Sequence, residues 1–234
     1  MKNVVIIGAG LGGLATAIRL AHYGYRVTIV EKNERVGGKM NIVRHNGYTF
    51  DTGPSLLTMP FIIRELFASV GEAMEDHITL VPVDPICRYW FSDGATLDAS
   101  GNLKNTEEEI ARLSAADVEG FRKFIAHGER IYNASAESFL FQPFGSLDIK
   151  GILGNLKLLP ALTKLDAFRT LNDAVETFFA DPRLQQLFNR FATYNGSSPY
   201  LAPATLAIIP YIEFAFGGWY VEGGMYKLAE ALEG

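Results

Sequence analysis

Cysteine and histidine are scarce in this chain of 234 residues, which has one cysteine, Cys87, and four histidines. A single cysteine cannot form an intramolecular disulfide, and the scattered histidines do not follow the spacing of a zinc site. We therefore expect neither a disulfide framework nor a bound metal. The simplest interpretation of Cys87, which stands among aromatic residues, is a small buried hydrophobic side chain.

Long apolar runs and blocks of basic residues are also missing. No stretch approaches the roughly 18 apolar residues of a membrane-spanning helix, and the apolar run at the N-terminus is too short for a signal peptide. The chain has 26 acidic and 21 basic residues, a net charge of −5, which argues against nucleic acid as a partner. We expect a cytoplasmic location, with peripheral contact on the cytoplasmic membrane as an open alternative.

What is present is enough apolar sequence for a substantial core, because 48% of the residues are hydrophobic. Residues 3–7 predict a buried strand, a glycine-rich turn follows at residues 8–13, and helical periodicity then continues to Gly24. Residues 27–30 predict a second strand that ends at Glu31. This order predicts a βαβ unit with parallel strands, and hence an α/β fold of the Rossmann type.

The turn at residues 8–13 fits the pattern G-x-G-x-x-G in the position that dinucleotide binding requires. Gly8 permits the tight turn, Gly10 lets the backbone approach a pyrophosphate, and Gly13 lets the helix pack on the strand. The carboxylate of Glu31 is placed to accept hydrogen bonds from both ribose hydroxyls and to repel the 2′-phosphate of NADP. The alternative is a βαβ unit with a glycine turn and no nucleotide.

Two further segments follow the same unit. Residues 33–40, N-E-R-V-G-G-K-M, combine paired glycines with Arg35 and Lys39, which suits a loop contacting phosphate or ribose oxygens. The alternative for these two cations is a solvated surface pair. Residues 51–54, D-T-G-P, then form a turn after a short strand around Tyr48.

The order of these segments resembles the superfamily of flavin-containing amine oxidases, protoporphyrinogen oxidases and phytoene desaturases. Its members show G-x-G-x-x-G, then Glu, then R-x-G-G-[KR], then D-x-G-P, which here are residues 8–13, Glu31, residues 35–39 and residues 51–54. The resemblance extends over essentially the whole chain.

Three later segments narrow the resemblance to bacterial carotenoid desaturases of the phytoene and diapophytoene type. They are residues 194–200, residues 202–205 and residues 218–225, G-W-Y-V-E-G-G-M. The last usually reads W-[YF]-P-x-G-G in that family, and Val221 replaces its proline while the glycine pair is kept.

The resemblance implies an FAD enzyme that removes hydrogen from a long polyene precursor, with the flavin as the redox agent. Gly223 and Gly224 would pass close to the isoalloxazine ring, where a side chain would not fit. The full set of expected cofactor-binding residues is Gly8, Gly10, Leu11, Gly12, Gly13, Glu31, Lys32, Arg35, Gly37, Gly38, Lys39, Gly53, Pro54, Gly223, Gly224 and Met225.

The middle of the chain changes character. Strand-like segments and the Asp93–Gly94 turn predict an antiparallel ribbon over residues 79–99, and residues 105–195 are mostly helical. Thr106 with Glu109 predicts a capping box, and Asp181 with Pro182 predicts a helix start. The resemblance makes this an inserted, mostly helical α+β substrate domain.

Residues 139–144 are rich in phenylalanine, and residues 149–165 are rich in leucine with only three lysines as charges, a composition typical either of ordinary core or of a surface that contacts a bilayer or a polyene. Asp148 falls near an acidic position of the family and is the candidate acid or base, with a helix N-cap as its alternative role.

The expected domains are residues 1–75 as the N-terminal part of the FAD-binding domain, residues 76–215 as the substrate- or membrane-facing domain, and residues 216–234 as a return to the first. Only two convincing parallel strands are found, and desaturases of this family are about twice as long, so we expect an N-terminal fragment with an incomplete sheet. Such a fragment should bind FAD weakly or not at all and should lack full activity. A homodimer would cover the exposed sheet edge.

Two other functions stay open at this stage. The N-terminal motifs also fit an amine or porphyrinogen oxidase, although residues 198–200 and 219–225 favour the carotenoid branch. The other alternative is a non-catalytic dinucleotide-binding module.

Overall fold

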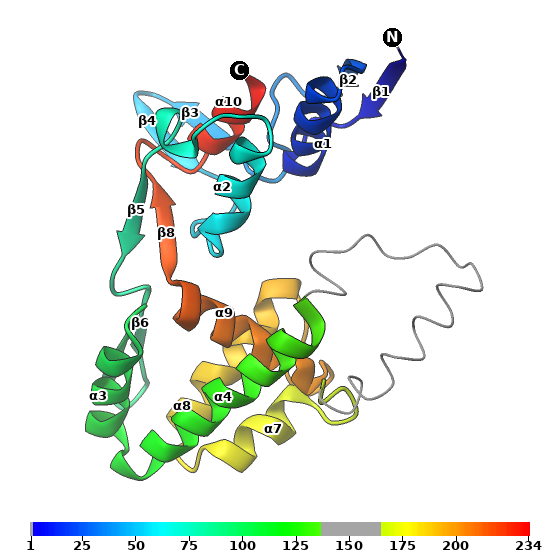
Figure 1. Cartoon of the computed structure of the whole chain (residues 1–234). Coiled ribbons are helices and arrows are strands. Elements are labelled where there is room, and N and C mark those ends of the chain that lie inside the picture. Colours follow the sequence, from blue (N-terminus) through cyan, green and yellow to red (C-terminus); the bar gives the residue numbers. More distant parts are fainter. Residues whose placement is uncertain (1, 137–164) are drawn as a thin grey trace, which may run out of the picture. The chain divides into compact units, whose positions relative to one another are not determined.

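The computed structural model describes residues 2–136 and 165–234, and the chain forms two compact units (Figure 1). Unit 1 comprises residues 1–83 and 216–234, and unit 2 comprises residues 84–215. Each unit has its own cluster of buried apolar side chains. Asp148 and nearly all of the apolar segment 139–165 lie outside the described residues, so their expected roles stay predictions.

Unit 1 begins with the predicted βαβ arrangement. Strands β1 (Asn3–Ile7) and β2 (Arg26–Val30) pair in parallel, and α1 (Leu11–His22) connects them. Gly24 has φ +80° just after the helix, where its N–H donates to Ala21. The apolar positions of α1 that face inward, Leu14 and Ala17, are buried.

The rest of unit 1 consists of two antiparallel strand pairs and three helical segments. They are β3 (Ile42–His45) with β4 (Tyr48–Asp51), β5 (Leu80–Val83) with β8 (Gly218–Val221), α2 (Pro60–Ala68), η1 (Met74–Asp76) and α10 (Lys227–Glu233). The core of the unit includes Leu66, Phe67, Val221 and Leu228, so residues from both ends of the chain bury one another.

The predicted ribbon over residues 79–99 is wrong in its first part. Strand β5 does not pair with the strand that follows it, but with β8, where Val81 lies opposite Tyr220 (Figure 1). Only β6 (Cys87–Trp90) and β7 (Thr96–Ala99) form the hairpin that the Asp93–Gly94 turn predicts. Apolar alternation identifies a strand but not its partner, and the β5–β8 pairing extends unit 1 to Val83, beyond the expected boundary at residue 75.

Unit 2 is mostly helical around the β6–β7 hairpin. Its helical segments are α3 (Leu103–Leu113), η2 (Ala115–Asp117), α4 (Val118–Ser135), α7 (Leu171–Phe178), α8 (Pro182–Asn189), η4 (Arg190–Asn195), η5 (Ala204–Ala207) and α9 (Ile208–Phe216). Six phenylalanines are 1% exposed or less: Phe121, Phe124, Phe179, Phe188, Phe191 and Phe214. The rings of Phe179 and Phe188 stack at 4.4 Å between centroids. Aromatic burial therefore dominates the stability of this unit.

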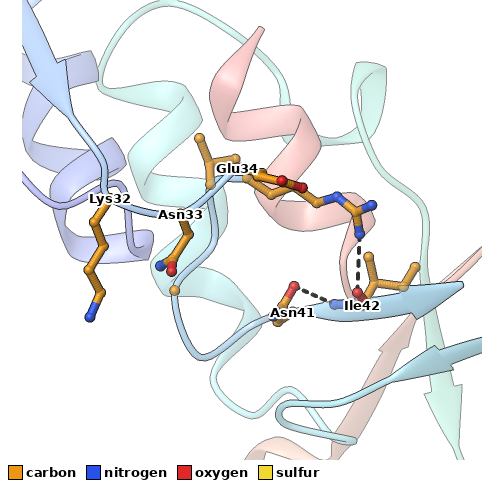
Figure 2. Close-up of a pocket in the computed structure, with 8 residues that line it drawn as sticks. Lys32, Asn33, Glu34, Asn41 and Ile42 are labelled. Atoms are coloured by element: carbon orange, nitrogen blue, oxygen red, sulfur yellow. Dashed lines mark hydrogen bonds between the residues drawn. The ribbon is translucent and has the colours of Figure 1, made fainter.

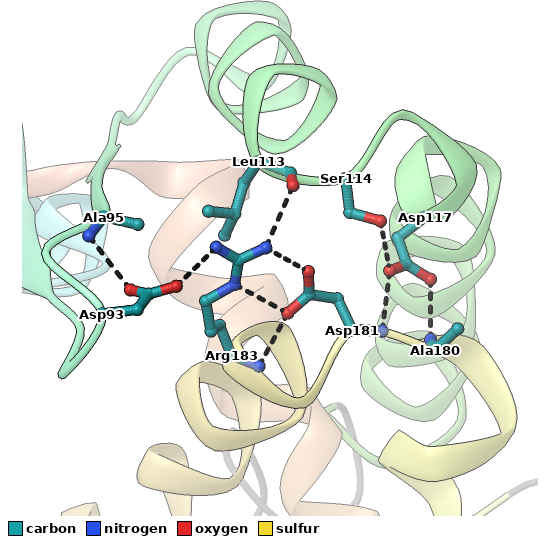
Figure 3. A network of polar contacts seen from close by, with 8 residues as sticks. All are labelled: Asp93, Ala95, Leu113, Ser114, Asp117, Ala180, Asp181 and Arg183. Carbon is teal, nitrogen blue, oxygen red and sulfur yellow. Dashed lines mark hydrogen bonds and ion pairs between the residues drawn. The ribbon is translucent and has the colours of Figure 1, made fainter.

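Buried polar contacts fix the start of α8 (Figure 3). The carboxylate of Asp117, 3% exposed, accepts hydrogen bonds from the backbone N–H groups of Ala180 and Asp181 at 2.7 and 2.9 Å and from the hydroxyl of Ser114 at 2.8 Å. Asp181 caps the helix as predicted, because its side chain accepts from the N–H of Arg183 at 2.8 Å.

The capping box predicted at Thr106 is wrong. Helix α3 begins at Leu103, and the side chain of Asn102 accepts the N–H of Lys104 at 3.0 Å. Thr106 is instead buried. Its hydroxyl accepts a hydrogen bond from the backbone N–H of Ser100 at 2.9 Å and donates one to the carbonyl oxygen of Ser100 at 3.1 Å. Asn and Thr are both good capping residues, so their order in the sequence did not decide which one starts the helix.

The parallel pair β1–β2 leaves apolar side chains in solvent. Val5 is 64% exposed, Ile7 90% and Val30 53%. Within residues 2–136 and 165–234 the parallel sheet has two strands, β1 and β2. The homodimer expected at this edge stays a prediction. Among the described helices, none has both the length and the apolar character needed to span a bilayer.

Candidate functional site

The glycine-rich turn lies between β1 and the N-terminus of α1. Gly8 has φ +101°, a conformation that other residues rarely adopt, and its N–H donates to Val30 at 2.8 Å. A Cβ atom at Gly13 would lie 2.1 Å from the carbonyl oxygen of Gly8, so the close packing of helix on strand requires glycine there. A Cβ at Gly10 would have no atom within 4 Å, which leaves room beside the backbone for a ligand.

The N-terminus of α1 has the properties of an anion site. No side chain caps the helix, and its first turn contains no acidic residue. Leu11 is half-buried and Gly12 is exposed at this end. The first N–H groups of a helix have no partner within it and carry partial positive charge, so they are suited to a pyrophosphate.

Glu31 is tied back to this turn. Its Oε2 accepts the N–H of Ala9 at 2.8 Å, and its Oε1 accepts the backbone and side-chain N–H groups of Asn33 at 2.9 and 2.8 Å. The hydrogen bond from Ala9, followed by the bond from Asn33, holds the pKa of Glu31 below its ordinary value. The carboxylate therefore stays ionised at the end of β2, the position predicted for the contact with ribose.

The second motif packs on the first. The N–H of Gly37 donates to the carbonyl of Ala9 at 2.7 Å, and Gly10 and Gly37 form a parallel bridge. A Cβ at Gly38 would lie 3.1 Å from the Cα of Gly10. Gly37 has φ +101°, and a Cβ there would lie 2.3 Å from the carbonyl of Met40. The paired glycines are therefore needed for the close contact of two loops.

The loop that carries Gly37 and Gly38 also has three cationic residues, Lys32, Arg35 and Lys39. Figure 2 shows the hollow that residues 32–36 line together with Gly38, Asn41 and Ile42, about 500 Å³ in volume. Arg35 donates from Nη1 to the carbonyl of Ile42 at 3.3 Å, so part of its guanidinium is occupied by the protein. The side chains of Lys32 and Lys39 are exposed. Lys32 and Arg35 line the hollow and make it suitable for an anionic ligand.

The third motif borders a second hollow next to the first. Gly53 and Pro54 line it with Lys39 and Thr52, and the two hollows share Gly38 and Asn41. A Cβ at Gly53 would lie 2.0 Å from the carbonyl oxygen of Lys39, and the N–H of Thr52 donates to Asn41 at 2.9 Å. The second and third motifs thus form one continuous wall.

Asp51 connects this wall to the C-terminal motif. Its Oδ2 accepts the hydroxyl of Tyr220 at 2.7 Å and the N–H of Met225 at 3.0 Å, whereas its Oδ1 is buried with no hydrogen-bond partner among the described residues. Burial pushes the pKa of Asp51 up, but the bonds from Tyr220 and the Met225 backbone outweigh this effect and lower it. Asp51 belongs to the D-T-G-P motif, but only Gly53 and Pro54 of that motif were predicted to bind the cofactor.

The glycine turn of the C-terminal motif, residues 223–224, lies next to Asp51. Gly223 and Gly224 have φ +83° and +115°, and a Cβ at Gly224 would lie 3.6 Å from Oδ1 of Asp51. The side chain of Met225 is 1% exposed and lies in the core of unit 1. Met225 therefore offers little but its backbone to a ligand in this structure, and its role at the cofactor stays a prediction.

Four sequence motifs thus meet in unit 1, although they come from both ends of the chain. The open space at Gly10, the uncapped end of α1, the ionised Glu31 and the unpartnered oxygen of Asp51 are features that a bound dinucleotide would use. No group of three or more His, Cys, Asp or Glu side chains that could hold a metal occurs in the described part of the chain. The donor set therefore fits FAD.

The family described as flavin containing amine oxidoreductase matches residues 11–234. The chain belongs to this family. Membership in this flavin family confirms the predicted cofactor, FAD, and the predicted superfamily of flavin oxidoreductases.

Two relatives in this flavin family are similar over almost the whole chain. A 4,4′-diapolycopene oxygenase of Methylomonas sp is 39% identical over 233 residues, 99% of this chain and 46% of that protein. A 4,4′-diaponeurosporene oxygenase of Staphylococcus aureus is 36% identical over 232 residues, again 46% of its length. These names confirm the predicted resemblance to the carotenoid branch. The chain spans about half the length of both relatives.

Solved structures of other flavin-family members agree with the fold. A putrescine oxidase bound to putrescine superposes with a TM-score of 0.64 at 18% identity, over 99% of this chain and 48% of the oxidase. At this identity the similarity bears on the fold alone.

Proposed function

We propose that this chain supplies the FAD-holding unit and the helical unit of an oxidoreductase that oxidises a long acyclic polyene of the carotenoid type. The observation that carries the proposal is the meeting of four motifs within unit 1, in a chain related over 99% of its length to enzymes named for diapocarotenoids.

The protein residues would hold FAD as follows. The N–H groups at the start of α1 and the cations Arg35 and Lys39 would hold the pyrophosphate, and Glu31 the ribose hydroxyls of the adenosine. Asp51 would keep the Gly223–Gly224 turn in place, where the absence of side chains leaves space for the ring system. When bound, FAD supplies the two-electron oxidation chemistry.

Oxygenation is the first candidate reaction, because both relatives are named oxygenases of acyclic diapocarotenoids. Desaturation, expected from the sequence resemblance, is the second, and the W-Y-x-x-G-G segment favours it. The two reactions leave different products, because oxygenation adds oxygen to the polyene whereas desaturation removes two hydrogen atoms and lengthens the conjugated system.

The first test is the visible absorption spectrum of the purified chain with and without added FAD, followed by mass analysis of what is released on denaturation. We expect flavin absorption only after FAD is added, because the described part of the parallel sheet has two strands and should hold the cofactor weakly. The loaded protein is then incubated in air with vesicles that contain 4,4′-diapophytoene or 4,4′-diapolycopene, and the products are identified by mass and absorption.

A chimera gives the second arm of the test. This chain replaces the matching segment of the Methylomonas relative, and the chimera should oxidise the polyene that the relative accepts. A chain that stays colourless with FAD, together with a chimera that binds flavin but leaves both polyenes unchanged, would contradict the proposed function.

A further inference from the structure

A polar cluster lies against the aromatic core of unit 2. Glu213 on α9 is 1% exposed, and the hydroxyl of Tyr194 donates a short hydrogen bond to its Oε2. The guanidinium of Arg190 lies 3.9 Å from its Oε1. Tyr89 on β6 completes the cluster, since Arg190 lies over its ring at 5.3 Å. Three of these four residues come from α9 and η4, which are adjacent to the buried phenylalanines.

Three buried polar atoms of this cluster have no hydrogen-bond partner among the described residues. They are the hydroxyl of Tyr89, Nε of Arg190 and Oε1 of Glu213. Asp117, the other buried carboxylate of the unit, accepts three hydrogen bonds. A buried polar group without a partner destabilises the fold, so three in one place call for a ligand or an ordered water.

Aromatic contacts orient the guanidinium of Arg190, and burial shifts the pKa values of Tyr89 and Glu213. Arg190 lies over the rings of Phe191, Tyr89 and Tyr194 at 4.6, 5.3 and 5.8 Å, so aromatic stacking holds the plane of its guanidinium. Burial raises the pKa of Tyr89, which therefore keeps its proton and remains a donor. Burial also raises the pKa of Glu213, against the opposing effects of Tyr194 and Arg190.

We propose that Tyr89, Arg190 and Glu213 bind a neutral oxygen group, a hydroxyl or an aldehyde, on an otherwise apolar polyene. The unpartnered set offers two donors and one acceptor, which matches the bonding capacity of a hydroxyl, and an aldehyde oxygen would use the two donors. The inference rests on the proposed function, since oxidation of a polyene is what would produce such a group.

The test compares three probes of equal chain length on the full chain, 4,4′-diapolycopene, its terminal aldehyde and the corresponding terminal alcohol, by quenching of protein fluorescence. We expect the aldehyde to bind about tenfold more tightly, the effect of roughly one good hydrogen bond to a charged donor. Tyr89→Phe should reduce severalfold the preference for the aldehyde over the hydrocarbon. Glu213→Gln should reduce severalfold the preference for the alcohol over the hydrocarbon. Both variants should bind the hydrocarbon as the wild-type chain does.

Tyr200→Phe is the matched control, because Tyr200 is 66% exposed and lies outside the cluster. The thermal stability of the ligand-free chain gives a readout that does not depend on the probes. Tyr89→Phe should leave the melting temperature unchanged or raise it, because the deleted hydroxyl has no partner. A lowered melting temperature would indicate an ordered water that satisfies this hydroxyl, and would overturn the site.

The remaining outcomes separate the two proposals. Equal affinity of the wild-type chain for hydrocarbon and aldehyde, or an unchanged preference in both variants, overturns the site and leaves the proposed function standing. If none of the probes binds to the flavin-loaded chain, the proposed function fails together with the site.

Discussion

The phenol of Tyr220 donates a hydrogen bond to Oδ2 of Asp51 at 2.7 Å, across 169 residues of sequence. The same oxygen accepts the N–H of Met225 at 3.0 Å. One carboxylate oxygen therefore joins the end of β4 to β8 and to the glycine turn that follows it. The geometry of the proposed flavin site depends on this contact between the two ends of the chain.

Asp51→Ala should lower both stability and FAD affinity. The substitution removes the acceptor for the Tyr220 hydroxyl and the Met225 N–H, and we expect it to lower the free energy of unfolding by about 1–3 kcal/mol. Tyr220→Phe removes one of these hydrogen bonds and should lower it by about 1 kcal/mol. Chemical denaturation and flavin titration measure the two effects. Tyr48→Phe, at an exposed tyrosine of β4, is the control and should change neither. Unchanged flavin affinity in a stable Asp51→Ala chain would remove Asp51 from the proposed site.

Neighbouring glycines at the start of α1 should respond oppositely to alanine. At Gly13 the new Cβ would lie 2.1 Å from the carbonyl of Gly8, so Gly13→Ala must separate helix from strand, at a cost of about 1–3 kcal/mol or more. At Gly12 a Cβ meets nothing within 4 Å, and alanine favours the helix, so Gly12→Ala should be neutral or slightly stabilising without ligand. Thermal unfolding of both variants decides the matter, and equal melting temperatures would contradict the assigned packing.

Glu31→Gln should weaken FAD binding, because the neutral amide accepts hydrogen bonds from ribose hydroxyls less strongly than a carboxylate. Glu65→Gln, on the exposed side of α2, is the control. Because the pKa of Glu31 is lowered in the folded chain, its charge persists below the ordinary value of 4.5. The part of flavin affinity due to Glu31 should therefore be constant at neutral pH and fall only as the pH drops through the lowered pKa.

NADP should bind more weakly than FAD in the wild-type chain, because the carboxylate of Glu31 would repel its 2′-phosphate.

Asp117→Ala should destabilise unit 2. The backbone N–H groups of Ala180 and Asp181 would both lose their acceptor next to a buried core, at about 1–3 kcal/mol for each unsatisfied group. Asp117→Asn retains one acceptor oxygen and should lose about half as much. Urea denaturation followed by far-UV circular dichroism measures both variants, and a fully stable Asp117→Ala chain would contradict this account of the α8 start.

The ion pair of Asp181 with Arg183 should make unit 2 sensitive to acid (Figure 3). The hydrogen bond from Arg183 is the main cause of the lowered pKa of Asp181. The folded-state pKa is thus below the unfolded value of 3.8, so the stabilisation is present above about pH 4 and is lost as the pH falls through the folded value. Asp181→Asn should flatten this part of the curve of melting temperature against pH, whereas Asp76→Asn, outside unit 2, should not.

The sequence by itself determined the local chemistry of the nucleotide site. The glycine spacing of residues 8–13, the apolar strands on either side and Glu31 at the strand end are short-range signals, because backbone sterics restrict such a turn to glycine. The same holds for the Asp93–Gly94 hairpin and the Asp181 cap, each of which is decided within a few residues.

Only the tertiary structure decided which distant segments meet. The strand pattern of β5 is equally compatible with β6, and its pairing with β8 depends on burial against residues from the other end of the chain. Asp51 and the cluster around Glu213 escaped the sequence analysis for the same reason. A carboxylate has no recognisable pattern of its own, and its role follows from donors that only folding brings within hydrogen-bond distance.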